Sequence, residues 1–238
     1  MVQYCGGKQR LAKKIAPRVL QDNPRAKVWT EPFCGMCSVA VEAHRLKPEL
    51  VCRLSDGNPS LVLMLNAIRG GWVPHLPSLD EYAELKSSTE PSALKGWVCT
   101  QLSYGGLWFK GRVGVNNQAN SYEYYHQTGV NTLPKLRNFL AAQPPVECKL
   151  FEMVRPRAGV VYADPPYTGT EKYYPVAFDQ DRFLAWANTV TVPLYLTEYF
   201  AGANWSEIED LGGPQHLSRN SRRTSEKLFV WTSPPKQT

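Results

Sequence analysis

The most informative stretch of this chain is Val160-Val161-Tyr162-Ala163-Asp164-Pro165-Pro166-Tyr167. Its first four residues are apolar or β-branched, and so short a run predicts a buried parallel strand rather than a helix. The prolines end the strand, because neither can donate to a sheet ladder and Pro165 keeps Asp164 extended. Asp164 and Tyr167 are therefore predicted at the carboxyl end of a strand, the edge where open α/β sheets bind ligands.

The chemistry of this turn suits a planar amine. The Asp164 carboxylate accepts hydrogen bonds but cannot donate them, the Pro165 carbonyl is a second fixed acceptor, and the Tyr167 ring offers a stacking face. Two acceptors and a ring can hold the exocyclic amine of a nucleobase with its lone pair toward an electrophile. Asp164, Pro165, Pro166 and Tyr167 are the candidate catalytic group. The alternative is a Pro-rich turn in which Asp164 only caps the next helix.

Length and composition predict an ordinary α/β protein. The 238 residues, 43% of them hydrophobic, suffice for one large α/β domain with an insertion or for two small domains. The sequence has no apolar run near the roughly 18 residues of a membrane span and no signal-peptide pattern, which predicts a cytoplasmic protein. The formal net charge of +6 favours a polyanionic partner.

Six scattered cysteines are predicted to be free thiols, several of them buried. Cys34 and Cys37 form a C-x-x-C, but the sequence lacks the second pair of ligands that a zinc site needs. We therefore predict no metal site.

The N-terminal stretch Tyr4-Cys5-Gly6-Gly7 predicts a tight turn, followed by Lys8 and a basic amphipathic helix over about 8–21. The two glycines let the backbone approach a ligand closely, and Tyr4 and Lys8 flank them. These four residues, Tyr4, Gly6, Gly7 and Lys8, are candidate ligand contacts. The other basic residues of the helix are read as its solvated face.

Two strand-turn-helix units follow. A strand over 27–30 runs into Glu31-Pro32-Phe33-Cys34-Gly35, whose small residues open a helix through Leu46, an arrangement typical of nucleotide sites. A second strand over 51–55 ends at Asp56, where a carboxylate can bind a ribose hydroxyl pair. Asn58 before Pro59 predicts the N-cap of a helix over 59–69. A cap does not prevent Asp56 from binding a ligand.

Residues 70–145 lose strong periodicity and collect glycines, aromatics and amides, which predicts an inserted DNA-recognition segment. The alternative is an aromatic-rich region that packs on the core. A basic loop near residues 219–223 can grip phosphate. The candidate DNA contacts are Lys110, Arg112, Asn116, Asn117, Tyr122, Arg222 and Arg223.

The remaining elements complete the sheet. Strands are predicted over 147–154, 193–196 and 226–231, with a helix capped by Asp179. The polar stretch Thr197-Glu198-Tyr199 ends one of these strands and is expected beside the Asp164 loop if the sheet is parallel. The alternative for Glu198 is a solvated strand end.

Five stretches in this order resemble the Dam-like, alpha-group DNA adenine-N6 methyltransferases of phages and bacterial modification systems. The matching stretches are 4–8, 31–35, 55–59, 162–167 and 197–199. The resemblance implies a Rossmann-like, seven-stranded sheet that binds S-adenosylmethionine, with residues 1–69 and 146–238 as the catalytic domain and 70–145 as the inserted segment. The family turn usually carries further glycines where this chain has Met36 and Cys37.

The resemblance also implies the roles of the candidate residues. Tyr4, Gly6, Gly7, Lys8, Glu31, Phe33, Gly35 and Asp56 would border or hold S-adenosylmethionine, and the Asp164 group would hold a flipped-out adenine of double-stranded DNA. The expected setting is a restriction-modification or phage protein, monomeric or homodimeric, in the cytoplasm of a bacterial or phage-infected host. Two alternatives stay open, namely cytosine-N4 methylation and an inert DNA-binding module on the same fold.

Overall fold

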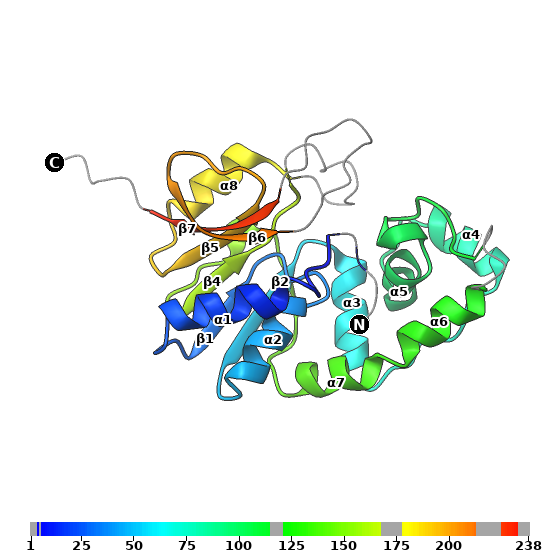
Figure 1. Ribbon diagram of the computed structural model, residues 1–238. Coiled ribbons are helices and arrows are strands. Elements are labelled where there is room, and N and C mark those ends of the chain that lie inside the picture. The colour runs from blue at the N-terminus through cyan, green and yellow to red at the C-terminus, as the bar shows by residue number, and fades with distance from the viewer. Residues whose placement is uncertain (1–3, 5, 115–120, 168–177, 213–224, 233–238) are drawn as a thin grey trace.

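The computed structural model describes residue 4 and residues 6–114, 121–167, 178–212 and 225–232. Within them the strands form a seven-stranded sheet with the order β3-β2-β1-β4-β5-β7-β6 (Figure 1). Strands β1 to β5 are parallel, and β7 runs antiparallel to its neighbours β5 and β6. This order confirms the Rossmann-like fold that the sequence predicts. The strands are β1 (Val28–Glu31), β2 (Val51–Asp56), β3 (Glu147–Cys148), β4 (Val160–Ala163), β5 (Leu194–Glu198), β6 (Trp205–Gly212) and β7 (Glu226–Trp231).

Helices connect and cover these strands. They are α1 (Ala12–Asp22), α2 (Ser38–Leu46), α3 (Pro59–Arg69), α4 (Leu79–Ser87), α5 (Ala93–Gln101), α6 (Tyr122–Val130), α7 (Leu133–Ala141) and α8 (Gln180–Ala187). The predicted caps are confirmed, since the side chain of Asn58 accepts from the backbone at the start of α3 and Asp179 does so for α8. Helix α1 starts later than predicted, because residues 8–11 form a turn that precedes it.

The sheet is buried on both faces, and the alternation along β4 shows how. Val160 and Tyr162 pack in the cluster that includes α1, α2 and α3, whereas Val161 and Ala163 pack with α8 on the other face. Successive side chains of a strand point to opposite faces. Asp164 follows with the parity of Tyr162, so the strand directs it to the face that α1 covers.

Two strands differ from the sequence prediction. Strand β3 spans two residues of the predicted 147–154, because the chain then turns through a short 3₁₀ helix at Phe151–Met153. Strand β6 was not predicted at all. It is an edge strand with exposed acidic residues and register shifts against β7, which removes the apolar alternation that marks a buried strand.

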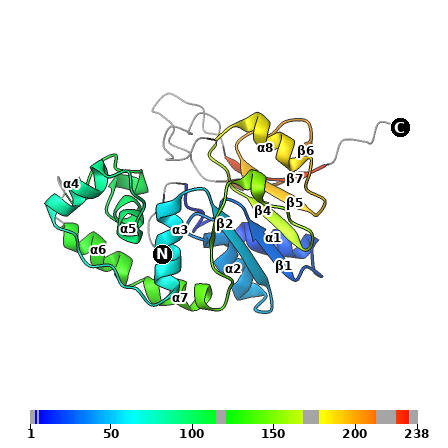
Figure 2. The ribbon, with the colours of Figure 1, turned by 180° about the vertical axis from the view of Figure 1, so that it is seen from behind.

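The segment 70–145 is helical in its described part. Helices α4, α5 and α6 lie to one side of the sheet domain, beyond α3 (Figures 1 and 2). Serine side chains cap all three, with Ser78, Ser92 and Ser121 each accepting from a backbone N–H of the first turn. None of the described helices has the length and apolar character needed to cross a membrane.

The end of this segment packs against the sheet domain. Helix α7 lies on α3, and Arg69 Nε donates to the carbonyl of Leu140. The Gln143 side chain accepts from the backbone N–H of Cys52 in β2 at 2.7 Å. The helical insertion and the sheet domain therefore share a continuous core near residues 133–143.

Candidate active site

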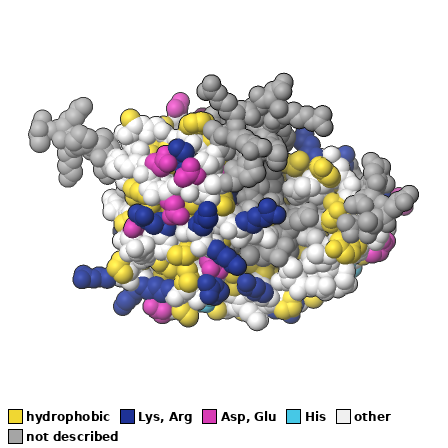
Figure 3. All heavy atoms as spheres, in the orientation of Figure 1, with side chains coloured by type: hydrophobic (Ala, Val, Ile, Leu, Met, Phe, Trp, Pro, Cys, Tyr) yellow, Lys and Arg dark blue, Asp and Glu magenta, His cyan; other side chains and the backbone are white. Residues whose placement is uncertain are grey.

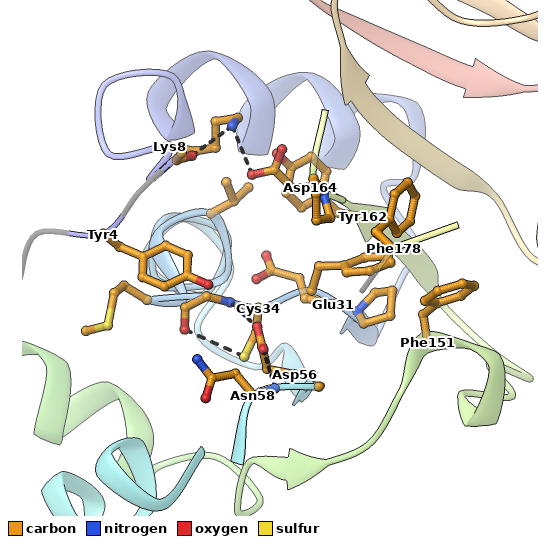
Figure 4. A pocket seen from close by; sticks show the side chains of 18 of the residues that line it. Tyr4, Lys8, Glu31, Cys34, Asp56, Asn58, Phe151, Tyr162, Asp164 and Phe178 are labelled. Carbon is orange, nitrogen blue, oxygen red and sulfur yellow. Dashed lines mark hydrogen bonds and ion pairs between the residues drawn. The ribbon is translucent and has the colours of Figure 1, made fainter. Parts of the chain in front are cut away.

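One pocket lies over the carboxyl ends of β1, β2 and β4 (Figure 4). The chain leaves β1 for β2 on one side and later returns to β4 on the other, so the pocket sits at the switch point of the sheet, where ligands of such folds bind. Every predicted cofactor contact lines it, together with two residues of the catalytic group. These lining residues are Tyr4, Gly6, Gly7, Lys8, Glu31, Phe33, Gly35, Asp56, Asp164 and Pro166.

Asp164 is held by a hydrogen bond from the neighbouring strand β5. The register of β4 and β5 pairs Tyr162 with Tyr195, so two residues further Thr197 lies beside Asp164. The Thr197 hydroxyl donates to Asp164 Oδ1 at 2.7 Å, and the Tyr162 hydroxyl lies 2.9 Å from the same threonine. This chain of contacts fixes the carboxylate at the edge of the pocket.

Lys8 completes the environment of Asp164. Its side chain is 6% exposed, and its ammonium lies 3.0 Å from Asp164 Oδ2. It also donates to the Gly6 carbonyl at 2.8 Å and lies 3.8 Å from Glu226 Oε2. The sequence predicts a tight turn before Lys8, and Gly7 N donates to the Tyr4 carbonyl in that turn. The turn thus brings the N-terminal lysine onto the carboxylate of β4.

Tyr167 is buried beside the pocket and does not line it. Its ring makes an edge contact with Tyr199 at 4.8 Å between centroids, and the Lys8 ammonium lies 4.6 Å from its centre. Burial, then the neighbouring carboxylates of Asp164 and Glu226, raise the pKa of Tyr167 well above its ordinary value. The hydroxyl is therefore protonated at neutral pH. Pro165 is also buried.

Glu31 contributes a second buried acid to the pocket. It is 2% exposed and accepts a hydrogen bond from Trp29 Nε1 at 2.8 Å, two residues back along β1. Burial raises its pKa from 4.5 to about 8, against the lowering effect of the Trp29 bond, and the charge of Asp164 adds to the rise. The carboxyl is mostly protonated at neutral pH in the absence of a cationic neighbour. A positive ligand would reverse that balance.

Asp56 ties β2 to the turn that follows β1. Its two oxygens accept from Gly35 N at 3.1 Å and from Asn58 N at 2.9 Å. Burial nevertheless raises its pKa from 3.8 to about 6. Each oxygen keeps a further acceptor position, so the predicted ribose contact stays compatible with this geometry.

The turn at 35–37 carries the departure noted in the sequence. Cys37 has a φ of 57° at the N-terminus of α2 and Gly35 a φ of 47°, a conformation that favours glycine. A Cβ at Gly35 would lie 2.9 Å from the Tyr4 ring. The chain thus adopts the tight turn with a cysteine at one left-handed position, and Tyr4 packs directly on Gly35.

The C-x-x-C thiols are buried in this turn. Both sulfurs lie near the Gly35 carbonyl, at 3.8 Å for Cys34 and 3.9 Å for Cys37. The contact with Cys37 and burial raise the pKa of the Cys34 thiol. A protonated, buried thiol is neither a nucleophile nor a metal ligand.

The other end of the pocket is aromatic. Phe33, Phe151 and Phe178 pack around one another with centroid distances of 5.2 to 5.9 Å. This end lies on the face of the sheet that α8 covers, opposite to the face of Asp164. An ion pair between Arg182 and Glu152 borders it. The pocket therefore joins an acidic end and an aromatic end across the edge of the sheet.

The candidate DNA contacts are distributed differently. Lys110 is exposed, whereas Tyr122 is 7% exposed and packs in the helical core. The Arg112 guanidinium lies 5.0 Å from the centre of the Tyr122 ring. This burial gives no support for base contact by Tyr122. The candidates Asn116, Asn117, Arg222 and Arg223 lie outside the described residues.

Several residues of the site were not assigned from the sequence. Thr197 belongs to the polar stretch expected beside Asp164, and its position is confirmed. Glu198 was left open, and it is 3% exposed rather than solvated. Glu226 and Phe151 were predicted only as strand residues. Two signals in the sequence could have identified these residues. They are the alternation of side chains along β7, for Glu226, and the aromatic side chain of Phe151.

A family match covers the first part of the site. Residues 4–92 match the model of the D12 class N6 adenine-specific DNA methyltransferases. The match confirms the predicted resemblance and supports a DNA adenine-N6 methyltransferase activity. It ends before β4, so the role of Asp164 is argued from geometry. No curated protein matches the chain significantly.

Solved structures of methyltransferases resemble the fold at low identity. A Pyrococcus horikoshii protein, provisionally assigned as an RNA methyltransferase, is 9% identical with a TM-score of 0.45, over 94% of this chain and 83% of that one. The rRNA methyltransferase aviRa from Streptomyces viridochromogenes is 14% identical with a TM-score of 0.43, over 97% and 86%. The magnesium protoporphyrin IX methyltransferase from Synechocystis is 10% identical with a TM-score of 0.39, over 94% and 79%. These likenesses concern the fold alone.

Proposed function

We propose that this protein transfers a methyl group from S-adenosylmethionine to N6 of an adenine that has left the stack of duplex DNA. One observation carries the proposal. Asp164, held by Thr197 at 2.7 Å, borders the same pocket as the buried acid Glu31 and the half-buried acid Asp56. The match of residues 4–92 to adenine-specific DNA methyltransferases supports adenine as the target.

The residues of the pocket fit S-adenosylmethionine. That molecule carries an ammonium, a sulfonium and a ribose, for which Glu31 and Asp56 are suitable acceptors, and its adenine ring suits the cluster of Phe33, Phe151 and Phe178. When bound, it supplies an electrophilic methyl group. A cation beside Glu31 favours the ionised carboxylate, which offsets the cost of its burial.

Asp164 would orient the target amine. One N6–H donates to the carboxylate and the other to the Pro165 carbonyl, so that the nitrogen lone pair points into the pocket. Alignment of the two reactants supplies most of the acceleration. The nitrogen loses one proton as it becomes N-methylated, and the Asp164 carboxylate is its nearest acceptor. Removing the base from the stack costs a few kcal/mol, of which aromatic stacking returns about 1–3 kcal/mol.

Exposed basic residues support DNA as the partner. Arg10, Lys13 and Lys14 are at or just before the first turns of α1, close in sequence to Lys8. The face that α1 occupies carries several Lys and Arg side chains (Figure 3). Phosphate contacts there would hold the duplex next to Asp164 without reading its sequence. The restriction-modification context, the oligomeric state and the bacterial or phage setting stay predictions from the sequence.

The test is to incubate the protein with labelled S-adenosylmethionine and mixed-sequence duplex DNA, and to identify the labelled nucleoside. We expect label in N6-methyladenosine. Label in N4-methylcytosine would mean that Asp164 accepts from an exocyclic amine as proposed, but that the target base is cytosine and not adenine. Absence of label together with absence of binding heat from S-adenosylmethionine would favour the inert module, with Cys37 at its positive φ as the first residue to replace by glycine.

A further inference from the structure

Lys8 stands where the proposed function needs the target base. Its ammonium contacts Asp164 Oδ2 at 3.0 Å and lies 4.6 Å from the centre of the Tyr167 ring. The carboxylate is the group to which the proposed function assigns the adenine amine, and the ring is the stacking face that the sequence predicts for the base. A base and an ammonium cannot share one face of the ring. Lys8 therefore has to move when the base enters.

Glu226 offers the ammonium a second position. It is the first residue of β7 and is 7% exposed. Its Oε2 lies 3.8 Å from Lys8 Nζ, too long for a hydrogen bond but within ion-pair range. Lys8 thus lies between carboxylates of two different strands, in contact with one and near the other.

We infer that Lys8 occupies the position of the target base until the base enters. Glu226 is then the positioning residue that forms the ion pair with Lys8 in place of Asp164. The inference rests on the proposed function, because it gives Asp164 the same partner. Only an ion pair is exchanged, and no covalent bond forms or breaks.

The exchange leaves none of the three charges unpaired. Asp164 keeps the Thr197 hydroxyl and gains the amine, while Lys8 keeps the Gly6 carbonyl and moves onto Glu226. A buried charge that loses its partner is strongly destabilised. Without the Glu226 carboxylate, base entry would break the Lys8–Asp164 pair with no replacement. Glu226 should therefore favour base entry only as long as Lys8 is present.

The experiment is a double-mutant cycle on base capture. The target adenine is first mapped by labelling duplexes of defined sequence. 2-Aminopurine then replaces the base next to that adenine, so that its fluorescence rises when the adenine leaves the stack in the absence of S-adenosylmethionine. We expect Glu226→Gln to weaken capture about tenfold, a typical coupling between two sites. In the Lys8→Met background the same substitution should change capture by less than about twofold. Glu226→Asp, which retains the charge, should recover most of the loss.

Glu207→Gln is the matched control, since Glu207 forms an exposed ion pair with Lys227 between β6 and β7. It should leave capture unchanged, and melting temperatures show that each variant folds. Equal losses from Glu226→Gln in both backgrounds would overturn the inference. A wild-type protein that neither labels DNA nor captures the base would overturn the proposed function and this inference together. A wild-type protein that does both, with additive variants, overturns the inference alone.

Discussion

The pocket at the sheet edge and the helical segment α4–α6 use the same kinds of side chain in different ways. Each contains a buried lysine. Lys8 lies against the Asp164 carboxylate, whereas Lys95 donates to the Ser88 carbonyl behind α4. Each also contains aromatic rings, which line the pocket at Phe33 but fill the helical core at Trp97. The partner of a buried polar group, and not its burial alone, therefore points to a candidate functional site.

The first prediction concerns Asp164, the carboxylate that Lys8 contacts in the pocket. Asp164→Ala removes the group that we propose orients the amine, and we expect methyl transfer to fall by about 10²–10³-fold or more, the usual cost of losing one positioned group in a transition state. Asp181→Ala is the control, because Asp181 is an exposed carboxylate in the first turn of α8. The measurement is the initial rate of label transfer. Equal rates in the Asp164 variant and the wild type would remove Asp164 from the mechanism.

The second prediction concerns the buried acid of the pocket. The folded pKa of Glu31 is raised from 4.5 to about 8, so the folded protein holds this proton more tightly than the unfolded chain. Its contribution is fully present below pH 4.5 and is lost as the pH rises toward about 8. Ligand-free wild-type protein should lose on the order of a few kcal/mol of unfolding free energy across this window.

Glu31→Gln separates this effect from other titrating groups. The amide cannot ionise, so the unfolding free energy of the variant should be flatter with pH than that of the wild type. Urea unfolding at several pH values between 5 and 8.5 measures both curves. Parallel curves would show that Glu31 keeps an ordinary pKa, and the acidic end of the pocket would then be ionised without a ligand.

The sheet edge was predictable because each short motif ends a strand. An apolar run followed by Asp56 or Asp164 places the carboxylate at one edge of a parallel sheet, whatever the distant sequence does. The alternation of side chains along the strand then determines on which face of the sheet the carboxylate lies. The pairing of Lys8 with Asp164 was not predictable, because it joins distant parts of the chain through a turn whose direction no local pattern sets.

The helical segment was poorly predictable for a different reason. Its helices are short, each nine residues long, and α5 packs against α3 as well as against α4 and α6. Periodicity is therefore weak, and the serine caps were the better signal. Tyr122 was assigned to DNA by residue type, which does not distinguish a stacking platform from a core residue. Strand β6 was not predicted because it lies at an edge of the sheet, where its polar and apolar residues do not alternate regularly.

The third prediction tests whether an aromatic ring that lines the pocket contributes to ligand binding rather than to stability. Phe33→Leu keeps apolar volume but removes a ring from the aromatic end of the pocket. We expect binding of S-adenosylmethionine to weaken about tenfold, within the range of one base-aromatic contact, with little change in unfolding free energy. Calorimetric titration measures the affinity. Phe200→Leu is the control, because that ring is 73% exposed and outside the pocket; equal losses in both variants would contradict a specific role for Phe33.

The last and smallest effect is expected in the helical segment. Tyr104 is 71% exposed at the start of a short turn, and Lys110 is exposed in the same loop. Tyr104→Ala should leave unfolding free energy within about 0.5 kcal/mol of the wild type and weaken DNA binding a few-fold. Lys110→Ala should reduce the slope of log affinity against log salt by about one, as the loss of one phosphate contact does.

Tyr122→Ala distinguishes contact with DNA from support of the loop. Because its ring is buried against Arg112, this variant should lose about 3 kcal/mol of unfolding free energy. Any loss of DNA affinity should follow from this loss of stability in the helical core, and not from a lost contact with DNA. Fluorescence anisotropy at several salt concentrations, paired with urea unfolding, measures both quantities. If Tyr104→Ala and Lys110→Ala bind DNA as the wild type does, while Tyr122→Ala binds weakly at full stability, the buried ring rather than the exposed loop reaches the DNA. The helical segment would then have to open on binding, because a ring packed in its core can meet a base only by leaving that core.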